Sequence, residues 1–424
     1  MVINSFNDTH ENITDTVNRG WDEIGIRTVP DLNFAGLIGS GKSRVTAFNG
    51  ERGGTSRTYL IPIQKRRNLK ILTEAFVTKI LINDHSQAYG VEVNIKGKKC
   101  TYFASLEIII SAGTINSPQL LLLSGIGCKD HLQSKDIPCK ANLPAVGRNL
   151  QDHLTVPVII YADKPGDINK SEQYLDTLIY LFNRTGHLAQ TDVGNNLAFY
   201  SRSTDASYPE FENHYKVFWK NSSSLEMFLT QIFNLKPIIV DHIVNENKKH
   251  AVYIFLFNLL HPYSRGTITL KTNYPYDHPL IDANYLDDER DIQATVDGIK
   301  MLTKIVNTTS FRSINAYLGR LNWPPCDKFG LDSDSYWRCI AVNCLCTIYH
   351  PVGTCKMGPN LFDSVVDSRL KVYLVKKLRV VDGSIMPTIT SGNVNGPIMM
   401  IAERAADFIK EDYGVIKTNV CEKK

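Results

Sequence analysis

The 424-residue sequence lacks three patterns that define common functional classes. Its nine cysteines include no Cys-x-x-Cys pair, so the usual zinc spacing is missing and we predict no metal. No apolar run approaches the roughly 18 residues that cross a bilayer, so we expect no membrane span. No basic block stands out beyond the short cluster at residues 65–67, and the net charge is +4. We therefore expect no nucleic-acid partner.

The N-terminal residues also lack the basic start and apolar stretch of a secretory signal. The first twelve, MVINSFNDTHEN, are polar and acidic. Asn-x-Ser/Thr acceptor sequences would nevertheless fit a secreted ancestor, so localisation stays open. They include those at Asn7, Asn12, Asn183, Asn221 and Asn307. The redox state stays open too, because Cys326 and Cys339 could form a disulfide across a short loop or could be buried free thiols.

The composition is typical of a globular protein with two or three domains. Hydrophobic residues make up 43% of the chain and charged residues 21%, and proline and glycine are scattered. A chain of this length can bury a large core. We therefore expect folded domains along most of the sequence.

The first 150 residues carry an α/β pattern. Residues 69–82 predict strands, and residues 88–104 predict a hairpin. The run EIIISAG that follows is typical of a strand buried on both faces of a parallel sheet. The next residues, TINSPQLLLLSGIG, predict a helix that is capped by Asn116 or Ser117 and ended by Gly125.

The middle of the chain carries no recognisable motif. Residues 154–260 are irregular in pattern and rich in aromatic and polar side chains; a strand at 266–270 and a helix at about 288–306 follow. We assign residues 154–345 to a sheet-containing, substrate-binding domain. The α/β pattern then returns, with a strand in KLRVVDGSIMP and a helix at about 396–411 that has one apolar face.

Residues 36–43, GLIGSGKS, match the P-loop pattern of nucleotide hydrolases letter for letter. A P-loop needs a buried strand before it and a helix after it, so that N–H groups converge on phosphate. Pro30 and Asp31 interrupt the upstream stretch, and the pairs Asn49-Gly50 and Gly53-Gly54 oppose a downstream helix. We interpret the stretch as a glycine-rich surface loop. The rival hypothesis, a P-loop hydrolase, predicts ATP or GTP binding.

One histidine has a setting that suits catalysis. In YHPVGTCKMG, Pro351 biases His350 toward an extended conformation and Gly353 permits an unusual turn, so the imidazole can be held at a cavity wall. A histidine that titrates near neutral pH can accept the proton of a hydroxyl while hydride leaves the same carbon. This is the chemistry of alcohol oxidation, and we predict His350 as the catalytic base.

Asn395, in SGNVNGP, is the second candidate. It lies just ahead of the C-terminal helix and predicts an N-cap, which places free N–H groups and a partial positive charge beside the same site. Such a helix end suits the negative charge of a reduced flavin. Asn395 could also hydrogen-bond the substrate oxygen beside His350. A plain capping role explains Asn395 equally well.

Five strings resemble the signature blocks of glucose-methanol-choline (GMC) oxidoreductases, in the right order, and are most similar to the insect members, such as glucose dehydrogenase. The strings are GTINSPQLLLLSGIG, AVGRNLQDH, YHPVGTCKMG, LRVVDGSIMPTITSGNVNGP and IAERAADFI. The resemblance implies an FAD-linked oxidoreductase acting on the CH–OH group of an alcohol, sugar or sterol, with an unknown electron acceptor. It implies that His350 is the base and Asn395 its partner. It also implies FAD contacts from Val77, Asp382, Gly383, Asn395 and Pro397.

The sequence departs from the family pattern at its start. It has no opening strand with a GxGxxG turn and no following acidic residue for the ribose of FAD. We therefore expect an α/β plus α+β fold: an incomplete, Rossmann-like FAD-binding domain made of residues 1–153 and 346–424, with the substrate-binding domain, 154–345, between them. The alternative hypothesis is a truncated, catalytically silent, ligand-binding homologue that cannot hold FAD.

Overall fold

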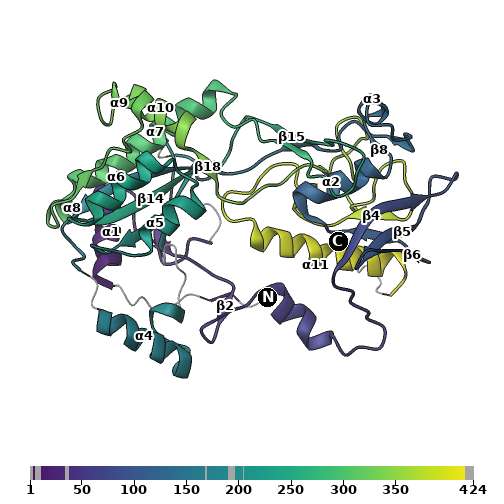
Figure 1. Ribbon diagram of the computed structural model, residues 1–424, viewed down its shortest axis with the longest axis horizontal. Helices are drawn as coiled ribbons and strands as arrows, with labels where there is room; N and C mark the ends of the chain where they lie inside the picture. The colour runs from purple at the N-terminus through teal and green to yellow at the C-terminus, as the bar shows by residue number, and fades with distance from the viewer. Residues whose placement is uncertain are drawn as a thin grey trace, which may run out of the picture. The chain divides into compact units, whose positions relative to one another are not determined.

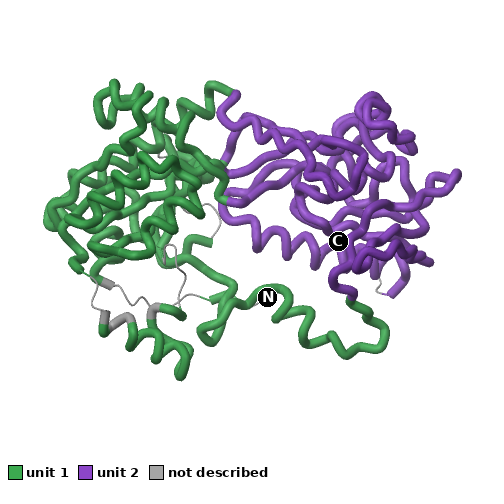
Figure 2. The backbone as a smooth tube through the Cα atoms, in the orientation of Figure 1, with its two compact units in different colours: residues 1–71, 154–260, 288–348 green, residues 72–153, 261–287, 349–424 purple. Residues whose placement is uncertain are grey.

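The chain forms two compact units, each assembled from three separate stretches (Figure 1, Figure 2). The computed structural model describes residues 3–4, 11–33, 38–167, 170–189, 196–203 and 205–415. Unit 1 combines Met1–Ile71, Leu154–Leu260 and Asp288–Ile348. Unit 2 combines Leu72–His153, His261–Asp287 and Tyr349–Lys424.

Unit 1 is organised around one antiparallel sheet of order β1-β12-β13-β14-β11-β17, in which β18 also pairs with β11. The strands of this sheet are β1 (Gly39–Lys42), β11 (Leu154–Ala162), β12 (Asn196–Tyr200), β13 (Phe211–Phe218), β14 (Ala251–Leu259), β17 (Tyr317–Leu318) and β18 (Cys346–Thr347). A separate short hairpin consists of β2 (Ala47–Phe48) and β3 (Glu51–Arg52). The strands β11, β12 and β14 are buried along their whole length. Their apolar and polar residues therefore do not alternate, which is why residues 154–260 looked irregular.

Helices pack on this sheet through aromatic side chains. The helical segments of unit 1 are α1 (Glu11–Glu23), η1 (Ser56–Leu60), η2 (Ile61–Ile63), α4 (Lys170–Asn183), η3 (His187–Ala189), α5 (Leu225–Met227), η4 (Phe228–Ile232), α6 (Pro237–Asn247), α7 (Glu289–Thr303), η5 (Lys304–Asn307), α8 (Thr309–Arg312), α9 (Pro324–Asp327) and α10 (Asp334–Cys344). Trp21 of α1 meets Phe255 of β14 edge to face, with ring centroids 6.0 Å apart. Gly298 of α7 lies so near β14 that an added Cβ would be 2.4 Å from the Phe257 ring. A disulfide joins Cys326 and Cys339, which settles the alternative left open by the sequence.

Unit 2 contains four small sheets around one apolar core. Its strands are β4 (Ala75–Ile82), β5 (Ala88–Ile95), β6 (Lys98–Phe103), β7 (Ile108–Ile110), β8 (Ile126–Gly127), β9 (Ala141–Asn142), β10 (Arg148–Leu150), β15 (Gly266–Thr269), β16 (Leu280–Asp282) and β19 (Leu378–Val380). The sheets are β4-β5-β6, β10-β15-β16, the parallel pair β19-β7 and the pair β8-β9. The helices are α2 (Gly113–Leu123), α3 (Lys129–Gln133), η6 (Gly383–Ile385) and α11 (Asn395–Asp412).

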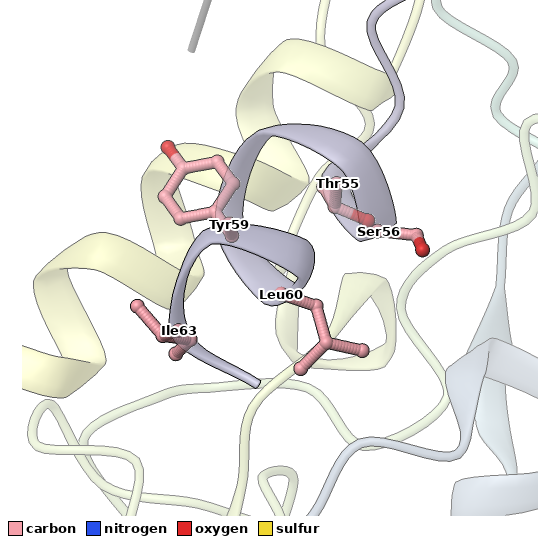
Figure 3. A pocket seen from close by; sticks show the side chains of 5 residues that line it. All are labelled: Thr55, Ser56, Tyr59, Leu60 and Ile63. Atoms are coloured by element: carbon pink, nitrogen blue, oxygen red, sulfur yellow. The ribbon is translucent and has the colours of Figure 1, made fainter. Parts of the chain in front are cut away.

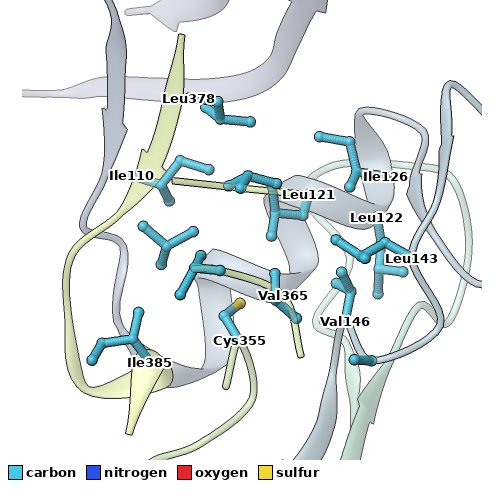
Figure 4. Packing of buried hydrophobic residues seen from close by; sticks show 14 of the residues in the cluster. Ile110, Leu121, Leu122, Ile126, Leu143, Val146, Cys355, Val365, Leu378 and Ile385 are labelled. Carbon is cyan, nitrogen blue, oxygen red and sulfur yellow. The ribbon is translucent and has the colours of Figure 1, made fainter. Parts of the chain in front are cut away.

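The core of unit 2 draws on residues that are far apart in the sequence. Figure 4 shows Leu121 and Leu122 of α2 in the same cluster as Ile110 of β7, Leu378 of β19 and Cys355. The parallel pairing of β7 with β19 brings the two strand-turn-helix segments of the sequence side by side. The core therefore fixes the segment that contains His350 against the start of α2.

The compact units differ from the predicted domains in two long stretches and in residues 346–348, which belong to unit 1, although both divide the chain between residues 153 and 154. Residues 1–71 belong to unit 1, because β1 pairs with β12. Residues 261–287 belong to unit 2, because β15 pairs with β10. The roles of cofactor domain and substrate domain stay predictions.

Two details of the predicted strand-turn-helix near residue 113 are wrong. The helix α2 begins at Gly113 with Ala112 as N-cap, so neither Asn116 nor Ser117 caps it. The hydroxyl of Ser117 instead donates to a carboxylate oxygen of Asp382, at 2.5 Å. The strand β7 is not buried on both faces, because Ile109 is 45% exposed. Gly125, with φ of +85°, follows the helix as predicted.

Gly39 and Gly41 of the P-loop pattern lie in a strand and not in a phosphate-binding loop. Gly36 lies outside the described residues, while Gly39–Lys42 forms β1, a largely buried edge strand rather than a surface loop. The next element of the described chain is the short strand β2, not a helix. An added Cβ at Gly39 or Gly41 would lie 2.6 Å from a backbone oxygen of residues 27–29. The alternating glycines therefore allow a close approach of two chain segments.

Candidate functional site

His350 lies on a segment of unit 2 whose backbone is tightly held. Tyr349 has a φ of +66° and Gly353 a φ of +94°, so the chain turns sharply on both sides of His350. An added Cβ at Gly353 would lie 2.5 Å from the backbone oxygen of Asn149, which explains the glycine. The hydroxyl of Thr114 donates to the backbone oxygen of Pro351, at 2.8 Å. These contacts limit how the imidazole can move.

Both ring nitrogens of His350 have a side-chain partner. Nε2 lies 3.1 Å from Nδ2 of Asn393, and Nδ1 lies 3.0 Å from Nδ1 of His153. The two imidazoles meet edge to face, with an interplanar angle of 85°. His350 is 7% exposed and His153 is fully buried, whereas Asn393 is exposed. The Nε2 side of His350 therefore faces the more open side of the site.

Asp152 fixes the main chain at His350. Its Oδ1 accepts a hydrogen bond from the backbone N–H of His350 at 2.9 Å, and its Oδ2 accepts one from the hydroxyl of Tyr285 at 2.5 Å. Asp152 is itself buried. Because the carboxylate bonds the backbone of His350, it sets the position of the residue and leaves both ring nitrogens to other side chains.

The predicted capping role of Asn395 is wrong. The helix α11 begins at Asn395 itself, with Val394 as N-cap and no side-chain cap. Asn393, two residues earlier, is still outside the helix, and its amide reaches Nε2 of His350. The structure thus brings Asn393 into hydrogen-bond distance of His350. The roles of Asn395 toward substrate and cofactor stay predictions.

The first turn of α11 fits a group with acceptor atoms and negative charge. Its N-cap supplies no side-chain oxygen, and an added Cβ at Gly396 would meet no described atom within 4 Å other than those of its chain neighbours and its own helix backbone. Pro397 occupies the same turn and carries no N–H. The partial positive charge at the start of an 18-residue helix suits the polar edge of a flavin ring. The charge at this helix end therefore agrees with the predicted cofactor.

Asp382 has a structural role that the sequence did not reveal. One carboxylate oxygen accepts hydrogen bonds from the backbone N–H of Gly113 at 2.9 Å and from Ser117 at 2.5 Å, and the other accepts one from the backbone N–H of Ser384 at 2.8 Å. The carboxylate thus joins the turn after β7 to the turn after β19. An added Cβ at Gly383 would lie 3.2 Å from the Thr114 hydroxyl. A contact of Asp382 or Gly383 with FAD stays a prediction.

Val77, predicted to meet the adenine side of FAD, lies on β4. This strand forms the edge of the sheet β4-β5-β6, and Val77 is 36% exposed. Half of the backbone groups of an edge strand point away from its single partner strand. A backbone contact of Val77 with FAD stays a prediction.

Further features of the described residues concern a buried thiol, metal ligands, helix length and a surface pocket. Burial raises the pKa of the Cys355 thiol, so this cysteine stays protonated at neutral pH. Within the described ranges, no three His, Cys, Asp or Glu side chains gather as metal ligands. No helix in the described part of the chain is both long and apolar enough to cross a bilayer. A pocket on the helical segment η1–η2 of unit 1 is lined by Thr55, Ser56, Tyr59, Leu60 and Ile63 and holds no carboxylate or imidazole (Figure 3).

Sequence reasoning missed four residues of the site: Asp152, His153, Tyr285 and Asn393. A signal existed for three of them. Asp152 and His153 end the string AVGRNLQDH, and Asn393 is in SGNVNGP. Both strings carry the family resemblance, but it did not indicate a role for these three residues. Tyr285 had no local signal, because its neighbours NYLDD form an ordinary polar loop and only the fold brings it to Asp152.

Comparisons with known proteins identify the family. Two family models described as GMC oxidoreductase match residues 1–155 and 262–402. Ecdysone oxidase of Bombyx mori is 37% identical over 404 residues, which cover 94% of this chain and 58% of that protein. Glucose dehydrogenase [FAD, quinone] of Drosophila melanogaster is 33% identical over 398 residues, covering 93% of this chain and 61% of the relative. The chain thus spans about three-fifths of the length of these relatives.

Solved structures share the fold. A formate oxidase of Aspergillus oryzae superposes with a TM-score of 0.82 at 22% identity, over 96% of this chain and 72% of that one. Pyridoxine 4-oxidase from Mesorbium loti superposes with a TM-score of 0.74 at 25% identity, over 96% and 71% of the two chains. The expected combination of α/β and α+β architecture, an FAD-binding fold with a sheet-containing second part, is confirmed. The chain belongs to the GMC oxidoreductase family.

Proposed function

We propose that this chain carries the base and substrate side of an FAD-dependent oxidoreductase that acts on the CH–OH group of an alcohol, sugar or sterol. The observation that carries the proposal is the buried imidazole of His350, which is held from behind by His153 and has its Nε2 toward the exposed Asn393. The relatives support the substrate class, because their names specify ecdysone, glucose and alcohol as substrates.

The residues of the site suit removal of a proton from a hydroxyl group. Nε2 of His350 accepts the proton of the bound substrate. The amide of Asn393, which contacts Nε2 in this structure, then donates to the substrate oxygen instead. Burial of His153 keeps bulk water from the Nδ1 side of His350. FAD, when bound, supplies the acceptor for the hydride from the same carbon.

Five residues would hold FAD. The first turn of α11, with Asn395 and Pro397, would meet the polar edge of the ring, and the turn of Asp382 and Gly383 would lie along the cofactor. The backbone of Val77 would meet the adenine side. The partial exposure of Val77 and the lack of a side-chain cap on α11 support these assignments.

Uptake of FAD and its reduction by alcohols test the proposal. Purified protein is mixed with FAD, freed from unbound cofactor by gel filtration and then treated with a panel of alcohols, sugars and sterols without oxygen. We expect about one flavin per chain and loss of the yellow absorbance with at least one CH–OH donor. Protein that stays colourless, or bound flavin that no donor reduces, would favour the silent, ligand-binding homologue.

A further inference from the structure

We propose that His153 is a positioning residue that sets the tautomer of His350 and stabilises its protonated form. The inference deepens the proposed function, because it depends on His350 acting as a base. It starts from one contact: the Nδ1 atoms of the two histidines lie 3.0 Å apart, with both rings buried.

The neighbours of His350 indicate which nitrogen carries the proton. Nδ2 of Asn393 lies 3.1 Å from Nε2, and an amide nitrogen can only donate. Nε2 must then accept, so in the neutral ring the proton lies on Nδ1. That proton points at Nδ1 of His153, which must accept and therefore carries its own proton on Nε2. The chain Asn393–His350–His153 thus has one consistent direction of donation.

This direction has a consequence for proton transfer. When Nε2 of His350 takes up a proton, the ring becomes a cation, and its Nδ1–H becomes a stronger donor to His153. A hydrogen bond that strengthens in the charged form favours that form. Since His153 is fully buried, the bond has no competition from bulk water. His153 therefore makes His350 a better base.

The other titratable groups that face the pair act on its backbone. Asp152 bonds the main-chain N–H of His350, and Tyr285 donates to the same carboxylate from the loop after β16. His261 contacts the hydroxyl of Ser391, on the loop that leads to Asn393. Nδ1 of His153 lies within hydrogen-bond distance of Nδ1 of His350. A substitution at residue 153 therefore acts directly on the tautomer of His350.

NMR of protein with labelled histidine tests the tautomer without FAD or substrate. The signal of His350 is assigned from its loss in His350→Gln. We expect wild-type His350 to show the Nδ1–H tautomer. In His153→Phe, which fills the space but cannot accept, we expect a mixture of tautomers and a titration midpoint at lower pH. The Nε2–H tautomer in the wild type, or an unchanged titration in His153→Phe, would overturn the proposal.

Two further variants separate this role from simple loss of folding. His153→Gln keeps an acceptor oxygen, so we expect it to retain more of the wild-type titration than His153→Phe does. His131→Gln is the matched control in unit 2, because His131 accepts a hydrogen bond from the backbone of Leu270, away from His350. We expect no change at His350 in this control. A shift at His350 in the control as large as that in His153→Phe would contradict the specific role.

Kinetics of FAD-loaded protein supply the second readout. We expect His153→Phe to lower kcat by about 10-fold or more, less than loss of the base itself, with little change in KM. The acid limb of kcat/KM should move to lower pH. Wild-type protein without any alcohol oxidation would refute the proposed function, while the NMR result would still decide the role of His153. An unchanged pH profile in an active His153→Phe would contradict the inference.

Discussion

The segment around His350 and the strand around Lys42 are both short, polar and glycine-containing, yet their glycines have different causes. Gly353 has a φ of +94° and bends the chain so that His350 meets side chains from two distant segments. Gly39 and Gly41 lie in an extended strand and allow a neighbouring backbone to approach. A glycine pattern thus indicates tight packing, and chemistry depends on which other side chains converge there.

Loss of the His350 imidazole should lower the rate of flavin reduction more than any other change proposed for these two segments. In FAD-loaded protein, His350→Ala should slow flavin reduction by alcohol about 10²- to 10⁴-fold, because the hydroxyl proton has no acceptor. Rapid mixing of enzyme with alcohol under anaerobic conditions measures this rate. Lys42→Ala, in the other segment, should leave the rate unchanged. Equal rates in wild type and His350→Ala would remove the functional difference between the two segments.

Asn393 and Asn395 provide a sharper comparison within the same loop. Asn393→Ala should lower kcat by about 10²-fold, because it removes the amide beside Nε2 of His350. Asn395→Ala should cost less in kcat and act mainly through retention of FAD. Steady-state kinetics and the flavin-to-protein ratio measure the two effects. A larger loss of kcat in Asn395→Ala than in Asn393→Ala would show that Asn395, which the sequence indicated, is the partner of His350.

Glycine substitutions should distinguish the turn at Gly353, which positions His350, from the close backbone approach at Gly41. Gly353→Ala and Gly41→Ala should each lower the free energy of unfolding by about 2–4 kcal/mol, since the first combines a left-handed φ with a clash and the second meets the backbone oxygen of Val29. Denaturant unfolding measures this. Only Gly353→Ala should also lower kcat per bound flavin. A comparable loss of kcat in Gly41→Ala would show that the strand contributes to the chemistry.

The smallest effect is expected for nucleotide binding. Wild-type protein and Lys42→Ala should both fail to bind ATP or GTP, because β1 presents a paired strand to β12 and no helix end to phosphate. Isothermal titration calorimetry measures this directly. Binding of ATP or GTP to the wild type that is lost in Lys42→Ala would support the P-loop hypothesis.

The sequence predicted the parts of the molecule that have local signals. The alternating residues of β5 and β6 predicted their hairpin. The helical spacing of apolar residues predicted α7, whose N-cap is Asp288. The strands β11 and β14 were missed, because their buried faces erase the alternation that marks a half-exposed strand.

In the candidate site, too, the sequence predicted only the residues that have a local signal. His350 could be predicted, because a proline and a glycine constrain it locally. Its contact with His153 could not, because 197 residues separate them and only tertiary packing unites them. The choice between Asn393 and Asn395 depended on where α11 begins, and a shift of two residues exchanges their positions.

Chemical rescue tests the central claim, that His350 is the proton acceptor, most directly. Added imidazole can enter the space that His350→Ala leaves and accept the hydroxyl proton in its place. We predict that imidazole raises the rate of flavin reduction in His350→Ala, more strongly as the pH rises and neutral imidazole accumulates, and leaves the wild-type rate unchanged. A rate in His350→Ala that does not respond to imidazole at any pH, in protein that holds FAD and is folded, would contradict the account.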